Sequence, residues 1–204
     1  MNFREFKDKT RKMPFFGSDL ADIFSLSPES MRNQLTRWKK SGLLVELRRG
    51  LYVLGREERQ VNLSREVAAA NIYQPSYISL ETALSHYKMI PEKTNAIISI
   101  TTRKTKEFNN PEGGFIYRHL KPSLFFGFIP KKDDNGFPYF MADPEKALLD
   151  YLYLNMGSIH PSDKQYFSGS LRLQNTALLN KKKLLSYAGR FKVKKLDAIL
   201  ENIK

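Results

Sequence analysis

Cysteine is absent from this chain of 204 residues, and histidine is rare, with only three copies. Without cysteine there can be no disulfide bond, no thiol nucleophile and no cysteine-ligated zinc. His86, His119 and His160 are widely spaced and match no metal-binding pattern. No glycine-rich phosphate-binding loop is present either. From these absences we expect a protein that is not an enzyme and that has no catalytic residue, metal site or cofactor.

Long apolar stretches are missing as well. No apolar run approaches the ~20 residues that a membrane-spanning helix needs. Residues 1–12 are basic, but no apolar segment follows them, so they do not have the pattern of a secretory signal. We therefore expect a soluble protein of the cytoplasm.

Acidic residues are few compared with basic ones: 21 against 34, for a net charge of +13. A basic excess of this size favours nucleic acid or an anionic membrane surface as a partner. The charge is concentrated at the two ends of the chain. It is +5 over residues 1–60, +1 over residues 61–159 and +7 over residues 160–204.

Residues 18–40 have the pattern of two helices joined by a tight turn. Ser27 is well suited to cap the second helix, and Pro28 to its first position. We expect this second helix to reach about Lys40, because Gly42 favours a helix end.

Two short apolar segments, 43–45 and 51–54, come next and are expected to form a β-hairpin. The turn between them contains Arg48, Arg49 and Gly50, whereas an ordinary hairpin turn more often uses Asn-Gly or Asp-Gly. Arginines at a hairpin tip suit contact with phosphates or with the minor groove. The order of elements is that of a winged helix-turn-helix, which lays its second helix in the major groove of DNA.

The two sides of the second helix differ in chemistry. Met31, Leu35 and Trp38 share one side and are expected to pack on a core. On the other side, Asn33 and Arg37 are types that read base edges, and their neighbours suit contact with phosphates. An ordinary amphipathic helix with a solvated basic face stays open as the alternative. The expected DNA-binding residues are Ser27, Ser30, Arg32, Asn33, Thr36, Arg37, Lys40, Arg48 and Arg49.

A polar stretch near Gly55 marks a boundary, so we expect a DNA-binding domain at 1–57 and a second domain at 58–204. The predicted fold class is α+β: an N-terminal winged helix-turn-helix, then a mixed α/β domain with a small sheet and a C-terminal helical cap. The second domain is expected to have helices capped by Ser64, Ser79 and Asp143, and strands at 96–102, 115–120, 124–129 and 137–141.

Residues 160–204 are expected to form a basic helical tail. Leu184, Leu185, Leu196 and Ile199 lie in an apolar stripe that should dock on the second domain. We expect the basic residues to face DNA, and a role toward a protein partner and a merely solvated face remain as alternatives. The lysines expected to be exposed, as a candidate second basic surface, are Lys181, Lys182, Lys183, Lys192, Lys194 and Lys195.

Three segments resemble the AbiEi family, the antitoxins of bacterial abortive-infection (type IV) toxin–antitoxin systems. They are the end of the winged-helix segment at Arg49–Leu54, the sequence YISLETAL at Tyr77–Leu84 and the sequence ADPEKALLD at Ala142–Asp150. The order and spacing of these motifs carry the resemblance, which spans roughly residues 15–155. The tail is not part of it.

The resemblance implies a winged-helix transcriptional regulator joined to a larger α/β antitoxin domain. It further implies that the protein binds double-stranded DNA at the operator of its own operon and represses that operon. The implied functional partner is a nucleotidyltransferase-like toxin, which the antitoxin counteracts without forming a stable complex. No membrane association is implied.

Two other functions remain as alternatives. One is an unrelated winged-helix regulator whose second domain binds a ligand or a protein. The other is a DNA-recruited nuclease, because Asp143, Glu145 and Asp150 lie close to Lys146 in the sequence, and acidic residues beside a lysine can hold a catalytic metal. Asp143 is better explained as a helix cap, so the nuclease is the weaker alternative.

Overall fold

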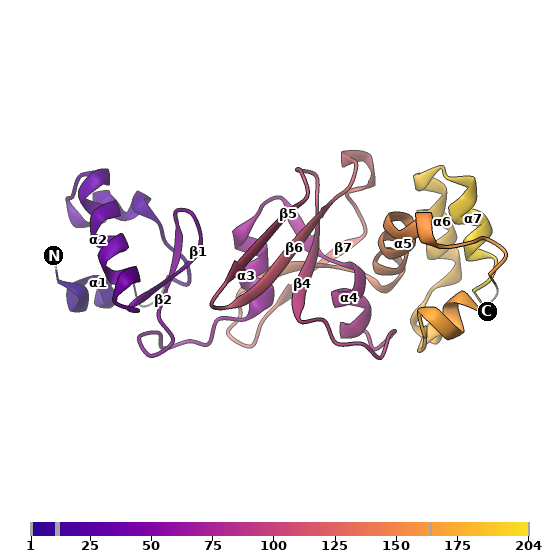
Figure 1. Ribbon diagram of the computed structural model, residues 1–204, viewed down its shortest axis with the longest axis horizontal. Helices are drawn as coiled ribbons and strands as arrows, with labels where there is room; N and C mark the ends of the chain where they lie inside the picture. Colours follow the sequence, from indigo (N-terminus) through magenta and orange to yellow (C-terminus); the bar gives the residue numbers. More distant parts are fainter. Residues whose placement is uncertain (1, 11–12, 164, 204) are drawn as a thin grey trace.

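The computed structural model describes residues 2–10, 13–163 and 165–203. The molecule is elongated, with a small N-terminal module at one end, a β-sheet in the middle and a group of helices at the other end (Figure 1). Among the helices that are described, none is long and apolar enough to span a bilayer.

The N-terminal module consists of helices followed by a hairpin. Its elements are α1 (Phe3–Thr10), the 3-10 helix η1 (Ser18–Phe24), α2 (Pro28–Lys40), β1 (Leu44–Arg48) and β2 (Leu51–Leu54). Phe16 and Tyr52 exchange two backbone hydrogen bonds of 2.8 and 3.0 Å, which add a short third segment to the hairpin. Helix α1 was not expected from the sequence, yet its Phe6 is fully buried and lies 4.6 Å, ring to ring, from Trp38.

The central sheet is mixed and has six strands in the order β5-β6-β4-β3-β8-β7. Its strands are β3 (Ser76–Ile78), β4 (Ala96–Thr101), β5 (Lys106–Asn110), β6 (Gly113–His119), β7 (Phe128–Lys132) and β8 (Pro138–Ala142). Strand β4 is parallel to β6 and antiparallel to β3, while β3 is parallel to β8. The mixed α+β class predicted from the sequence is therefore confirmed.

The sheet is larger than predicted, because β3 and β5 were not expected. Strand β5 is an edge strand with no fully buried side chain, so it lacks the apolar pattern that identifies a strand in sequence. Strand β7 begins at Phe128 rather than at residue 124. The chain before it forms the short 3-10 helix η2 (Pro122–Leu124), and Gly127 follows in a left-handed conformation with φ of 73°.

Helices α3 (Arg65–Ile72), α4 (Leu80–His86) and α5 (Pro144–Asn155) belong to the same region. The first residues of these helices test the three predicted helix caps. Ser64 accepts a hydrogen bond from Val67 N at 3.1 Å, and Asp143 accepts one from Lys146 N at 2.9 Å. Ser79 forms no such cap, because its hydroxyl donates instead to a carboxylate of α5.

The C-terminal part contains the short turns η3 (Met156–Ser158), η4 (Tyr166–Ser170) and η5 (Thr176–Leu178), then α6 (Lys181–Phe191) and α7 (Lys194–Leu200). Leu184, Leu196 and Ile199 are buried, as the stripe predicted. Leu185 was wrongly placed in that stripe, because its side chain is 66% exposed. Helix α6 therefore buries a narrower face than the sequence suggested.

The hairpin joins the two halves of the molecule. Leu44, Tyr52 and Leu54 belong to the hydrophobic cluster of the N-terminal module, whereas Leu47 and Val53 belong to the larger cluster of the sheet and its helices. Hydrogen bonds and ion pairs across this junction reinforce the packing. They include Asn110 Nδ2 to Leu47 O at 2.9 Å and Arg59 to Glu112 at 2.5 Å.

Candidate nucleic-acid interface

Helix α2 is held in place by the side that it buries. Met31 and Leu35 are fully buried and Trp38 is nearly so, which matches the predicted core face. Ser27 caps the helix by accepting a hydrogen bond from Ser30 N at 3.1 Å, and its hydroxyl also bonds Ser30 Oγ at 2.9 Å. The side chain of Ser27 is thus already used in fixing the start of the helix.

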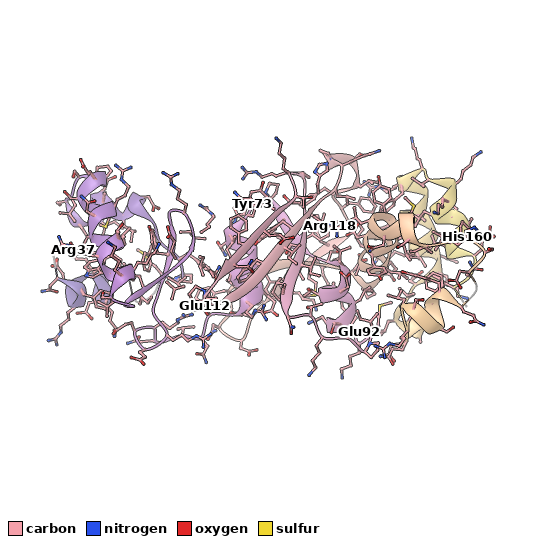
Figure 2. The ribbon with its side chains drawn as sticks, in the orientation of Figure 1. Arg37, Tyr73, Glu92, Glu112, Arg118 and His160 are labelled. Carbon is pink, nitrogen blue, oxygen red and sulfur yellow. The ribbon has the colours of Figure 1, made fainter. Side chains whose placement is uncertain are left out.

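The opposite face of α2 points away from the rest of the molecule. Figure 2 shows Arg37 at the end of the molecule that is farthest from α6 and α7. Of the basic residues in this helix, Lys39 is the one that forms an ion pair with a described residue. The predicted recognition residues on this face are all exposed: Ser30, Arg32, Asn33, Thr36, Arg37 and Lys40.

Lys39 has a different task, which sequence reasoning missed. Its Nζ lies 2.5 Å from Glu46 Oε2 on β1, and the other carboxylate oxygen of Glu46 accepts a hydrogen bond from Gly50 N at 3.3 Å. Burial acts to raise the pKa of Glu46, but the hydrogen bonds from Lys39 and Gly50 outweigh it and lower that pKa below its ordinary value. The ionised carboxylate therefore ties α2 to the tip of the hairpin.

The two arginines at the hairpin tip are placed differently from one another. Arg49 is exposed, next to Gly50, which adopts a left-handed φ of 79° in the turn. Arg48 donates from Nε to the carbonyl of Ile72 at 2.7 Å and from Nη1 to Arg49 O at 3.0 Å. Arg48 thus links the hairpin to the last turn of α3, where a cation is also favoured by the helix dipole.

The lysines of the tail lie at the end of the molecule opposite α2 (Figure 1). Most are exposed, and Lys195 donates to the carbonyl of Met156 at 2.6 Å. The prediction that Lys183 is exposed was wrong, because its side chain is only partly exposed. Its Nζ lies 3.1 Å from Asp143 Oδ2 and 3.0 Å from Glu145 Oε2. The two buried carboxylates attract the Lys183 ammonium toward the core. The sequence of the tail could not show this, because both carboxylates lie on another part of the chain.

A buried polar network accounts for the acidic and basic residues of the ADPEKALLD segment. The side chains of Lys146 and Asp150 form an ion pair with no solvent exposure. Asp150 also accepts hydrogen bonds from Ser79 at 2.8 Å and Tyr77 at 2.9 Å. Burial lowers the pKa of Lys146 and raises the pKa of Asp150 and of Tyr77.

Asp143 and Glu145 serve the packing of the tail against α5. Asp143 caps α5 and accepts a hydrogen bond from Tyr187 at 3.2 Å, while Glu145 accepts one from Asn180 N at 2.8 Å. Burial acts to raise the pKa of Glu145, but the bonds from Asn180 and Lys183 lower it overall. All of the carboxylates considered for a nuclease are therefore bound to internal partners.

Among the residues that the structure describes, no group of three or more histidine, aspartate or glutamate side chains is arranged to hold a metal ion. No family model matches the chain, and no curated protein matches it. The exposed face of α2 and the tip of the hairpin beside it carry the residues that the sequence predicted to contact DNA.

Proposed function

We propose that this protein is a DNA-binding transcriptional repressor whose N-terminal module acts as a winged helix-turn-helix. One observation carries the proposal: the outward face of α2 combines base-reading and phosphate-binding side chains that have no ion-pair partner among the described residues. The exposed Arg49 lies at the tip of the hairpin that Lys39 and Glu46 fasten to that helix. The net charge of +13 supports a polyanionic partner.

In this proposal α2 enters the major groove and the hairpin lies beside it. Asn33 and Arg37 contact base edges, with Thr36 and Lys40 on the sugar-phosphate backbone. Arg49 adds a phosphate or minor-groove contact. The cap and the buried side of α2 fix the orientation of the helix, and so the face that it presents, before DNA binds.

A direct test uses DNA from the region upstream of the protein's own reading frame. The full-length protein should bind such a duplex at least ~10³-fold more tightly than an unrelated duplex of equal length, as specific DNA-binding proteins do. Fluorescence anisotropy at physiological salt measures both affinities. Equal affinity for the two duplexes would contradict operator recognition, and no binding even at low salt would contradict DNA binding altogether.

We also propose the antitoxin role that the resemblance to the AbiEi family implies. In this role the protein represses its own toxin–antitoxin operon and counteracts a nucleotidyltransferase-like toxin without forming a stable complex. The support for this role is the resemblance itself, which the motifs YISLETAL and ADPEKALLD carry; in the fold the two motifs meet in one buried network through Tyr77, Ser79, Lys146 and Asp150. A reading frame for a nucleotidyltransferase-like protein directly downstream is the expected genetic context.

An apolar groove gives some support to a second candidate, a regulator whose sheet domain binds an apolar ligand. The groove has a volume of about 540 Å³ and is lined by aromatic side chains that include Phe125, Phe128 and Phe140. A concave, mostly apolar cavity of this size is typical of small-molecule sites. A ligand that fits it and changes operator affinity would favour this candidate.

The tail allows the DNA-binding and antitoxin roles to be separated. We predict that replacing Lys181, Lys182, Lys192, Lys194 and Lys195 with glutamine leaves binding of a short operator duplex unchanged, because these residues lie at the opposite end from α2. The same variant should weaken rescue of cells that express the toxin. Lys183 is kept, since it neutralises Asp143 and Glu145. Weaker operator binding with intact rescue would instead assign the tail to DNA, and no change in either would make it a solvated face.

A further inference from the structure

A basic surface distinct from the tail lysines begins at the hairpin tip and runs along the edge of the sheet. One hollow of about 620 Å³ lies between the tip, the end of α3 and strand β5, and its lining includes Arg48, Arg49 and Lys106. A second hollow of about 660 Å³ adjoins it and includes Lys104. Tyr73 and Arg103 line both hollows, so the two form one continuous surface, which we call the basic groove.

Three of the cations in the basic groove are held in place before any ligand binds. Arg48 is anchored by the carbonyl of Ile72, as described above. Arg103 donates to the carbonyl of Gln74 at 3.3 Å and lies 4.6 Å above the ring of Tyr73. Lys106 lies 5.0 Å above the ring of Phe108. Side chains that are already ordered lose less conformational entropy when they bind an anion.

The positive charge of the basic groove is not neutralised within the groove. Arg48, Arg49, Arg103, Lys104 and Lys106 are all exposed, and no aspartate or glutamate is among the residues that line the two hollows. Five cations along one surface suit an extended polyanion better than a single small anion, since a polymer presents its phosphates in a row.

The aromatic rings in the basic groove favour a backbone contact over stacking with bases. Tyr73 packs edge-on against Tyr117 with centroids 5.3 Å apart, and Phe108 packs edge-on against the same ring at 5.8 Å. The faces of Tyr73 and Phe108 are further covered by Arg103 and Lys106. Proteins that grip single strands leave such faces free for bases, which these rings do not.

We propose that the basic groove binds the sugar-phosphate backbone of duplex DNA that flanks the segment contacted by α2. The proposal rests on the proposed function, because it extends the same duplex past the hairpin tip to the sheet domain. Arg48 and Arg49 form the start of the groove at the tip itself. DNA binding then uses both halves of the molecule, which the hairpin holds together.

The test compares the double variant Arg103→Gln/Lys106→Gln with the wild-type protein on two duplexes. One duplex extends beyond the footprint of α2 on both sides, and the other is trimmed to that footprint. On the long duplex the variant should lose two phosphate contacts. The ratio of wild-type to variant affinity should therefore fall about 12-fold between 50 and 200 mM salt, because each phosphate contact adds to the salt dependence of binding. On the trimmed duplex the two proteins should bind equally.

A matched control removes the same charge elsewhere. Lys88→Gln/Lys93→Gln alters two exposed lysines that lie close to Glu92 in the sequence. Figure 2 shows Glu92 on the opposite long side of the molecule from Tyr73. This control should keep the wild-type salt dependence on both duplexes. Circular dichroism and the melting temperature confirm that all variants fold.

Three results would overturn the basic groove as a duplex-binding surface. In the first, the groove variant keeps the wild-type salt dependence on the long duplex while an α2 variant loses operator binding. The groove is then not a duplex-binding surface, and the proposed function stands. Weaker binding confined to a single-stranded oligonucleotide of the same sequence would reassign the groove to single strands. Failure of the wild-type protein to bind any duplex would overturn both proposals.

Discussion

Replacing Asp150 with alanine is expected to lower the free energy of unfolding by about 3–5 kcal/mol. The substitution leaves the ammonium of Lys146 in a site with no solvent exposure and without its counterion. It also removes the acceptor for the hydroxyl groups of Ser79 and Tyr77. Urea denaturation at neutral pH, followed by circular dichroism, measures the change.

Two controls separate burial from the ion pair itself. The exposed pair Glu5–Lys9 has the same i,i+4 spacing at 3.7 Å, and Glu5→Ala should cost only about 0–1 kcal/mol. The double variant Lys146→Met/Asp150→Leu removes both charges and should recover the part of the loss that comes from the unpaired ammonium, but not the part that comes from the hydroxyl groups of Ser79 and Tyr77. A loss below about 1 kcal/mol for Asp150→Ala alone would contradict the buried network, because an uncompensated buried charge costs more than that.

Arg37→Ala is expected to reduce the affinity for the operator duplex by ~5- to 150-fold, which corresponds to ~1–3 kcal/mol for a lost bidentate base contact. Arg37 lies on the exposed face of α2 and forms no ion pair with any residue that the structure describes. Affinity for an unrelated duplex should fall much less, because that affinity depends on phosphates. Anisotropy titrations on both duplexes give the ratio.

Arg37→Lys is the matched control for charge. Lysine keeps the positive charge but lacks the planar fork that bonds two acceptors of guanine. The lysine variant should therefore retain the affinity for unrelated DNA and still lose affinity for the operator. If alanine weakens both duplexes equally and lysine restores both, Arg37 contacts only the backbone, and the base-reading role passes to Asn33.

The sequence by itself determined the features that depend on near neighbours in the chain. The caps at Ser27, Ser64 and Asp143 follow from side chains that bond a backbone N–H three residues away. The buried side of α2 follows from helical periodicity, so its exposed face was also predictable. The mixed α+β class was evident because apolar runs of strand type alternate with helical patterns along the chain.

Tertiary structure decided the features whose partners are distant in sequence. Arg48 donates a hydrogen bond to the carbonyl of Ile72, and Lys183 forms ion pairs with Asp143 and Glu145. The positions of these two side chains could therefore not be predicted from the segments that contain them. The basic groove arises only because folding brings the hairpin tip against β5, an edge strand with little apolar pattern. Periodicity and capping act within one helix or strand, whereas burial of a charge depends on which other elements pack around it.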